Sequence, residues 1–432
     1  MSSAKDFHNA FLDTSRPEKV MSYYVNRAID DTQDSVAEMK QAVEWEETPG
    51  CYLFSGLRGA GKTTELQRLT TELADANIPA FYCNADAYLD LNDPTITQAE
   101  LIFTALAGLA DAVKAAYGKE FLQQTLWERV KSTMNSEVEL QPTLKTAAPG
   151  FEAEVQFSLK ENHTFKQELI KFAASSGSFF HEANQFANEV AAFVKQQTKQ
   201  SKIVLIVDSL ERLSAPNGQE HLLFESLKEL FFNSPSRLFF DSISVIYTVP
   251  PYIHAVLPGI DQFYSGIFSL PNFKIMQTPK PSHAIERNDN GIAKMVEVVA
   301  KRFPDWQQYL TTAVIEEFAW LSGGNIRRMF ALIRHTTRKA VLGKVVFPVA
   351  EITSEPVEQA IAEETKNIQW LNAQDRKWLL HCQEHSGQLA QCIKNLQEDL
   401  PPIIRLFDHS LVLNYQNGRV WYQVPPIIHG KI

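Results

Sequence analysis

The sequence predicts an α/β protein: a parallel sheet held between helices, followed by a helical region and a small C-terminal domain. Between residues 52 and 277, short and almost wholly apolar runs alternate with helical segments, whereas the chain from residue 281 to about 365 is helical throughout. Strands of a parallel sheet are buried on both faces, so they read as continuous apolar runs. At 432 residues the chain is long enough for two or three domains, each with its own core.

Composition and charge limit the function. The net charge of −10 disfavours binding to nucleic acid or anionic lipid through overall charge, although a local basic patch is compatible with it. The four cysteines are dispersed without a CxxC pair, which argues against a disulfide framework or a structural zinc site and favours a reducing compartment. The polar N-terminal stretch and the lack of a long apolar run predict a cytoplasmic protein with no membrane segment.

The predicted elements follow from apolar runs and helical periodicity. Residues 1–48 are expected to form an arm that ends in a helix over 34–44, where Val36, Met39 and Val43 share one side. The core domain is expected at 49–283. Its strands are predicted at 52–55, 80–84, 203–207, 243–249 and 273–277, and its main helices at 63–74, within 97–197 and at 220–232.

A β-hairpin insertion is predicted at residues 138–160. After the Pro149-Gly150 turn the sequence alternates, which places Phe151, Val155, Phe157 and Leu159 on one face. The insertion is either a structural flap or a protruding contact for a partner protein or a DNA strand.

Two further domains are expected after the core. Residues 284–362 should form a helical lid. Residues 363–432 have the outline of a winged helix: helices at 374–385 and 389–398, a short turn at 402–407, and a hairpin around Asn417-Gly418, a pair typical of two-residue type I′ turns. Trp421 and Tyr422 are expected in the core of this domain. From Lys366 onward seven Lys and Arg stand against five acids, a weak basic footprint for a DNA reader.

The run CYLFSGLRGAGKTTELQRL predicts a phosphate-binding loop. Gly56-x-x-x-x-Gly61-Lys62-Thr63 follows an apolar strand and opens a helix. The glycines let backbone N–H groups turn toward phosphate oxygens at the positive end of the helix. Lys62 should reach the β- and γ-phosphates of ATP, and the Thr63 hydroxyl should hold Mg²⁺. The residues expected to bind the nucleotide here are Gly56, Gly59, Ala60, Gly61, Lys62, Thr63 and Thr64.

The segment SKIVLIVDSLERL predicts the acidic partner of this loop. Five apolar residues end in Asp208, the pattern of a strand whose terminal carboxylate holds Mg²⁺ through water. Hydrolysis also needs a group that orients the attacking water. Ser209 follows Asp208 where an acid could stand, and Glu211 is the nearest candidate. Slow hydrolysis is therefore expected.

Two more sites are predicted around the γ-phosphate. The apolar strand ISVIYTVPP ends near Thr248, whose hydroxyl could report the presence of that phosphate. In LSGGNIRRMFALIRHTTRK, a Gly-Gly-Asn turn precedes a helix, and Arg327 in its first turn could reach the γ-phosphate from the lid. Arg334 and Arg338 share the face of Arg327, either as a solvated face or as a basic surface.

Together these residues resemble an AAA+/STAND-type P-loop ATPase of the origin-recognition-like sort. SGLRGAGKTT resembles the Walker A loop, LIVDSLE the Walker B strand, YTVP the sensor-1 strand and SGGNIRR the sensor-2 lid motif. The resemblance implies an ATP-binding P-loop core, a helical lid, a C-terminal winged helix and nucleotide-dependent assembly. It also implies that Tyr24 and Val25 lie near adenine. The loop and the hairpin insertion are similar to those of ATPases of bacterial antiviral systems.

Two departures from the family pattern favour a switch over a processive motor. Ser209 replaces the usual second acid, and residues 262–272 contain no arginine where an arginine finger is expected, which leaves Arg212 or Arg237 as candidates. The expected function is a regulatory ATPase that couples its nucleotide state to a homo-oligomer, a co-encoded effector protein or DNA. The alternatives are a small-molecule kinase and a scaffold that binds ATP without hydrolysing it.

Overall fold

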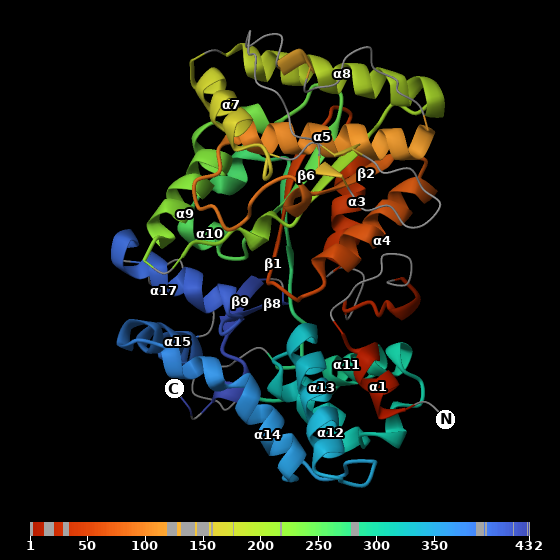
Figure 1. Cartoon of the computed structure of the whole chain (residues 1–432), viewed down its shortest axis with the longest axis vertical. Coiled ribbons are helices and arrows are strands. Elements are labelled where there is room, and N and C mark those ends of the chain that lie inside the picture. Colours follow the sequence, from red (N-terminus) through yellow and green to blue (C-terminus); the bar gives the residue numbers. More distant parts are fainter. Residues whose placement is uncertain are drawn as a thin grey trace. The chain divides into compact units, whose positions relative to one another are not determined.

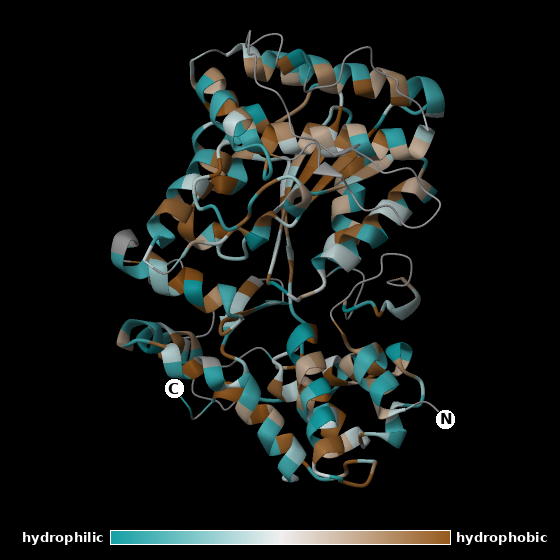
Figure 2. Ribbon diagram, viewed as in Figure 1, coloured by the Kyte–Doolittle hydropathy of each residue, from teal (hydrophilic) through white to brown (hydrophobic). Residues whose placement is uncertain are grey.

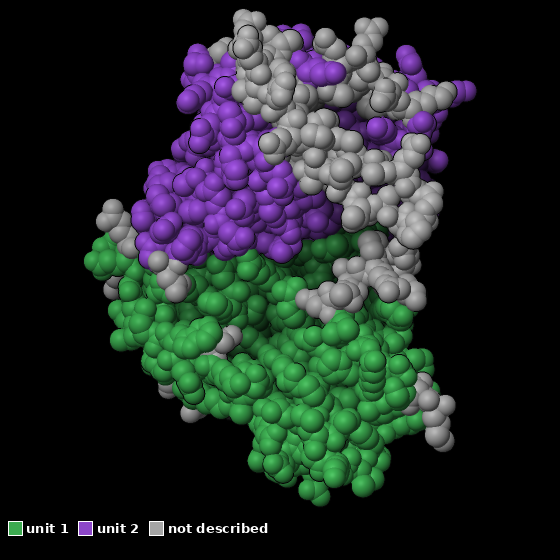
Figure 3. Space-filling model, viewed as in Figure 1, with its two compact units in different colours: residues 1–38, 56–68, 269–432 green, residues 39–55, 69–268 purple. Residues whose placement is uncertain are grey.

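The computed structural model describes all residues except 1–2, 13–20, 29–33, 119–127, 131–142, 145–154, 157–158, 176, 217, 278–284, 386–392, 394, 418, 430 and 432. It divides into two compact units, which Figure 3 colours separately. We name them the sheet unit (residues 39–55 and 69–268) and the lid unit (residues 1–38, 56–68 and 269–432). Within the described part of the chain, no helix has both the length and the apolar character needed to cross a bilayer.

A five-stranded sheet with the order β2-β5-β6-β1-β7 forms the core of the α/β region. The pairs β2–β5, β5–β6 and β6–β1 are parallel, and nearly every side chain of β1, β5 and β6 is buried. This confirms the prediction of a parallel sheet from continuous apolar runs. The strands are β1 (Cys51–Gly56), β2 (Ala80–Asn84), β5 (Val204–Asp208), β6 (Ser244–Val249) and β7 (Gly266–Leu270).

Helices cover the sheet (Figure 1). Helix α5 (Gln98–Tyr117) packs on β2 and begins at a capping box in which Thr97 and Glu100 bond each other's backbone amides. Gly118, with a φ of 65°, ends it in a left-handed cap. Other described helices of the α/β region are α3 (Ser35–Trp45), α4 (Lys62–Asp75), α7 (His163–Ser175), α8 (Ser178–Thr198), α9 (Glu220–Lys228) and the short α10 (Ile253–Val256).

The predicted hairpin insertion is present as two short paired strands. Strand β3 (Thr143–Leu144) pairs antiparallel with β4 (Val155–Gln156). The predicted turn at Pro149-Gly150 and the positions of Phe151 and Phe157 lie outside the described residues. Leu159, the last apolar residue of the predicted face, is buried.

The lid unit contains four helices where the sequence predicts a helical lid: α11 (Asp289–Arg302), α12 (Thr312–Leu321), α13 (Ile326–Leu342) and α14 (Glu355–Glu364). Helix α14 alternates teal and brown in Figure 2, as expected for a helix with one buried face. A short N-terminal helix, α1 (Ala4–Ala10), packs on α13, and its Phe7 ring stacks on Tyr309 at 4.6 Å. The sequence analysis expected only an arm there.

The predicted last core strand at 273–277 is wrong, because strand β7 occupies Gly266–Leu270 instead. Residues 273–277 form a single bridge, between Met276 and Arg287, and their apolar side chains Phe273, Ile275 and Met276 are buried. A β-carbon built on Gly291 of α11 would lie only 2.0 Å from the carbonyl oxygen of Lys274. This apolar run is therefore buried under a helix that carries a glycine at the contact, and it needs no neighbouring strand.

The C-terminal part combines helices α15 (Ala373–His385) and α17 (Leu396–Asp408) with a hairpin of β8 (Leu413–Asn417) and β9 (Arg419–Gln423). The predicted turn at 402–407 is wrong, since α17 continues through Pro401 and Pro402. Its strongly amphipathic pattern buries Ile403, Ile404 and Phe407, and that burial outweighs the lost backbone hydrogen bonds. Of the predicted helix at 389–398, residues 389–392 and 394 lie outside the described residues, and residues 396–398 form the start of α17. Trp421 and Tyr422 are buried, as predicted.

We expect Gly291→Ala to destabilise the chain, although alanine normally stabilises a helix. The added methyl group would clash with the Lys274 carbonyl, and overpacking of this kind costs about 1–3 kcal/mol. Urea unfolding of the variant and the wild type would measure the change. Gly177→Ala is the matched control, because nothing lies within 4 Å of a β-carbon there. Equal stability of the two variants would contradict the packing described above.

Candidate nucleotide-binding site

The glycine loop joins the end of β1 to the start of α4. Gly59 and Gly61 have φ angles of 76° and 98°, in the left-handed region that favours glycine. The Lys62 side chain is 3% exposed, and its Nζ donates hydrogen bonds to the carbonyl oxygens of Gly56 at 2.7 Å and Leu57 at 2.8 Å. The loop thus folds around a buried ammonium group directly before the positive end of a helix, which fits an anionic ligand.

The other predicted loop residues lie along the same turn. Gly56 and Ala60 are buried, and the Ala60 amide donates to the carbonyl of Leu57 at 3.2 Å. Thr63 and Thr64 stand half-buried in the first turn of α4. A hydroxyl at Thr63 is the donor type that Mg²⁺ accepts, so the residues present fit a nucleotide with its metal ion.

The Gly-Gly-Asn turn of the lid lies against this loop. A β-carbon built on Gly59 would stand 2.6 Å from Cβ of Arg327. Asn325 Nδ2 donates to the carbonyl oxygen of Arg58 at 3.4 Å, and Asn325 Oδ1 caps helix α13 by accepting from the amide of Arg328 at 3.1 Å. The structure therefore brings Arg327 and the glycine loop together, as the sequence predicts.

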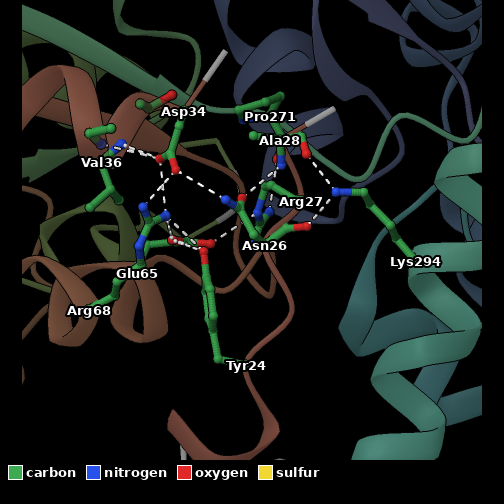
Figure 4. A network of polar contacts seen from close by, with 12 residues as sticks. Tyr24, Asn26, Arg27, Ala28, Asp34, Val36, Glu65, Arg68, Pro271 and Lys294 are labelled. Carbon is green, nitrogen blue, oxygen red and sulfur yellow. Dashed lines mark hydrogen bonds and ion pairs between the residues drawn. The ribbon is translucent and has the colours of Figure 1, made fainter. Parts of the chain in front are cut away.

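The N-terminal segment around Tyr24 packs on the first turns of α4. Figure 4 shows Tyr24, Glu65 and Arg68 converging, with the Tyr24 hydroxyl donating to Glu65 Oε2 at 3.2 Å and accepting from Arg68 Nη1 at 2.8 Å. Burial and the Glu65 carboxylate raise the pKa of Tyr24 well above its usual range. Val25 is buried. Of the two residues predicted near adenine, Tyr24 thus lies beside the helix that follows the glycine loop.

Arg27 is a site residue that the sequence analysis missed. Its Nε contacts Glu65 Oε1 at 3.2 Å, its Nη1 donates to the carbonyl of Pro271 at 2.9 Å, and its guanidinium lies 4.9 Å from the centre of the Phe273 ring. A β-carbon built on Gly61 would stand 2.9 Å from Arg27 Nη2. Arg27 stands two residues after Val25, which the sequence analysis had already placed near the nucleotide. This positive charge so close to that segment is the signal that could have identified it.

Asp34 completes this network. It accepts from Arg68 Nη2 at 2.6 Å and from the amide of Val36 at 3.1 Å (Figure 4). Burial alone would raise the pKa of Asp34, but the hydrogen bonds from Arg68 and the backbone outweigh it and hold the pKa below its usual value. A small cavity beside the network is lined by Asn26, Arg27, Ala28, Asp34, Ser35, Val36, Glu65, Leu270 and Pro271.

The sheet unit holds the predicted acidic group. Asp208 is fully buried at the end of β5, where its Oδ2 accepts from the Tyr82 hydroxyl at 2.6 Å and its Oδ1 from the amide of Ser209 at 2.7 Å. Ser209 has a φ of 81°, unusual for a residue other than glycine. Such outliers concentrate at functional sites, where the surrounding structure holds them.

Thr248 and Glu211 belong to the same edge of the sheet. Thr248 Oγ1 accepts from the amide of Leu210 at 3.0 Å, so the end of β6 is tied to the turn that follows Asp208. Glu211 lies in that turn and is 8% exposed. The structure therefore groups Asp208, Glu211 and Thr248, to which the sequence analysis assigned Mg²⁺, the attacking water and the γ-phosphate.

The two arginine-finger candidates have other contacts. Arg212 pairs with Asp86 at 2.8 Å, and the Arg237 guanidinium lies 4.3 Å from the centre of the Phe180 ring. Both contacts lie within the sheet unit.

Comparison with known proteins finds only distant structural similarity. The sequence matches no protein-family model and no curated protein. The fold is similar to Cdc6p of Pyrobaculum aerophilum, with 10% identity, a TM-score of 0.39 and coverage of 97% of this chain and 94% of that chain. For the ORC2 protein of Aeropyrum pernix, solved in ADPNP–ADP complexes, the identity is 10% and the TM-score 0.40, with coverage of 97% of this chain and 93% of that chain. For the RuvB Holliday junction branch migration motor of Thermotoga maritima, the identity is 14% and the TM-score 0.34, with coverage of 92% of this chain and 94% of that chain.

We expect Glu65→Gln to destabilise the chain by about 3 kcal/mol, because it leaves two partly buried guanidiniums without their shared carboxylate. Urea unfolding would measure the loss. The control is Glu44→Gln on α3, where the ion pair with Lys40 is 3.6 Å long and about 30% exposed, so the cost should be about 0.5 kcal/mol or less. A Glu65→Gln variant as stable as the control would show that the network does not hold the N-terminal segment.

Proposed function

We propose that the chain is a regulatory ATPase of the AAA+/STAND type, which binds ATP with Mg²⁺ and hydrolyses it slowly. One observation carries the proposal: the lid residue Arg327 lies against Gly59 of a complete phosphate-binding loop. A cation from the lid at this position suits a device that reads the phosphate content of a bound nucleotide.

The residues of the glycine loop would hold the triphosphate. Backbone N–H groups between Gly56 and Gly61 would donate to phosphate oxygens, and Lys62 would exchange its carbonyl partners for the β- and γ-phosphates. Thr63 and Asp208 would hold Mg²⁺, Asp208 through water. The bound ATP supplies a phosphoanhydride bond that can be hydrolysed. The segment of Tyr24 and Val25 would contact the base.

Slow turnover follows from the residues after Asp208. Ser209 cannot accept a proton from water as a carboxylate does, so Glu211 is the group that would orient the attacking water. Thr248 would sense the γ-phosphate through its hydroxyl. An inactive Glu211 would turn the chain into a scaffold that binds ATP without hydrolysing it.

Arg327 would couple nucleotide state to assembly. ATP, but not ADP, offers a γ-phosphate to this residue, and a ligand shifts a conformational equilibrium only when it binds two states differently. The partner would be a second copy of the chain, a co-encoded effector protein or DNA. The resemblance to ATPases of bacterial antiviral systems extends the proposal to antiphage defence.

The decisive experiment is ATP turnover by the full chain, with Lys62→Ala as the blank. Lys62→Ala should abolish nucleotide binding, because the buried ammonium is the charge that the phosphates meet. Intact ATP binding by that variant would overturn the assignment. Turnover should also be measured with single- and double-stranded DNA: stimulation would identify DNA as the trigger, and indifference would point to a protein partner.

We expect Glu211→Gln to lower kcat by about 100-fold or more while ATP affinity stays within about twofold, since the change removes a base and keeps the shape. Phosphate release and ATP binding, measured separately, would test this. Unchanged turnover would assign the water-orienting role to another group. Glu161→Gln serves as the control, because it makes the same chemical change in an exposed turn 50 residues before Glu211 in the sequence.

A further inference from the structure

The lid turn at residues 322–325 has a second contact surface besides the glycine loop. Gly323 and Gly324 both have left-handed φ angles, 70° and 78°. Such a turn is intrinsically permissive, because glycine has the widest choice of backbone conformations. Its conformation, and with it the direction of Arg327 at the start of α13, must therefore be fixed by what packs around it.

The C-terminal hairpin packs around it. The hydroxyl of Tyr415 on β8 donates to the carbonyl oxygen of Gly323 at 2.5 Å, and Tyr415 is fully buried. A β-carbon built on Gly323 would lie 2.2 Å from Cδ1 of Leu413. The Tyr415 ring stacks on Trp421 of β9 at 4.5 Å, which holds the hydroxyl in place. Figure 1 labels the hairpin strands and α13.

Three further hydrogen bonds tie the hairpin and the residues just before it to the end of β7, the segment after it and α13. The backbone N–H of Asn272 donates to the carbonyl oxygen of Asn414 at 2.9 Å, and the side-chain Nδ2 of Asn414 donates to the carbonyl oxygen of Leu270 at 3.2 Å. Arg328, the residue after Arg327, is 9% exposed and donates through Nη2 to the carbonyl oxygen of Ser410 at 2.9 Å. Successive residues of α13 therefore contact the glycine loop and the C-terminal domain.

We propose that the β8–β9 hairpin positions Arg327 over the glycine loop, with Tyr415 as the positioning residue, so that the C-terminal domain controls how well the chain distinguishes ATP from ADP. The inference rests on the proposed function, because it assigns the hairpin a role in nucleotide sensing. A partner that binds the C-terminal domain and shifts the hairpin would change the nucleotide response without touching the nucleotide.

The test compares Tyr415→Phe with Tyr422→Phe, which removes a hydroxyl from a buried tyrosine of the same hairpin. The readout is the ratio of ATP to ADP affinity of the full chain, measured by displacement of a fluorescent ATP analogue. Tyr415→Phe should lower this ratio by about fivefold to tenfold, the effect of one buried hydrogen bond. Tyr422→Phe should leave it unchanged. A purely structural loss would weaken both nucleotides equally.

A double-mutant cycle with Arg327→Ala shows whether Tyr415 acts through Arg327. In the Arg327→Ala background, adding Tyr415→Phe should leave the ratio unchanged. An equal effect in both backgrounds, or no effect of Tyr415→Phe on the ratio, would overturn the inference while ATP binding stands. If the wild type binds ATP no better than Lys62→Ala, the proposed function fails, and the inference fails with it.

Hydrogen exchange of the wild-type chain gives a second test that does not depend on the tyrosine variants. ATP, compared with ADP, should slow amide exchange in residues 411–417 of the wild type and not of Arg327→Ala. Identical exchange with both nucleotides in the wild type, with ATP bound, would overturn the proposed link.

Discussion

The lid turn can rest on the glycine loop only because Gly59 has no side chain. Any β-carbon there would stand 2.6 Å from Arg327, a distance that real contacts do not reach. The left-handed φ of Gly59 makes the same demand independently, since larger residues rarely adopt it. This one position therefore serves two purposes: it permits the left-handed conformation of the loop, and it admits the arginine that would detect phosphate in the proposed function.

Close backbone approach recurs throughout the lid unit. A β-carbon built on Gly324 would lie 2.1 Å from the carbonyl oxygen of Phe273, and one built on Gly291 would lie 2.0 Å from the carbonyl oxygen of Lys274. Gly324 and Gly291 thus both pack on the backbone of the segment after β7. The guanidinium of Arg27, in the N-terminal segment, lies over the Phe273 ring. A buried network of charges then ties the N-terminal segment to the helix of the glycine loop. Packing and electrostatics converge on the same few residues.

The sequence predicted the parallel sheet, the glycine loop and the approach of Arg327, because each has a strong local pattern. It failed where long-range packing decides the outcome. Residues 273–277 look like a strand by hydropathy, yet their apolar side chains are buried where a helix with a glycine packs on the backbone. Pro401 and Pro402 look like a helix end, yet the apolar side of α17 carries the helix through them. Arg27 was missed because its partners are 38 and 244 residues away, so that its position two residues after Val25 was the one local hint.

The start of helix α13 carries an electrostatic imbalance. A helix N-terminus bears a partial positive charge and favours acids, but the first turn of α13 contains two adjacent arginines and no acid. One guanidinium is buried and the other is exposed beside the glycine loop. Any polyanion bound at that loop would relieve this repulsion, so the heat resistance of the lid unit should depend on the anions in its surroundings, rising with their charge and concentration.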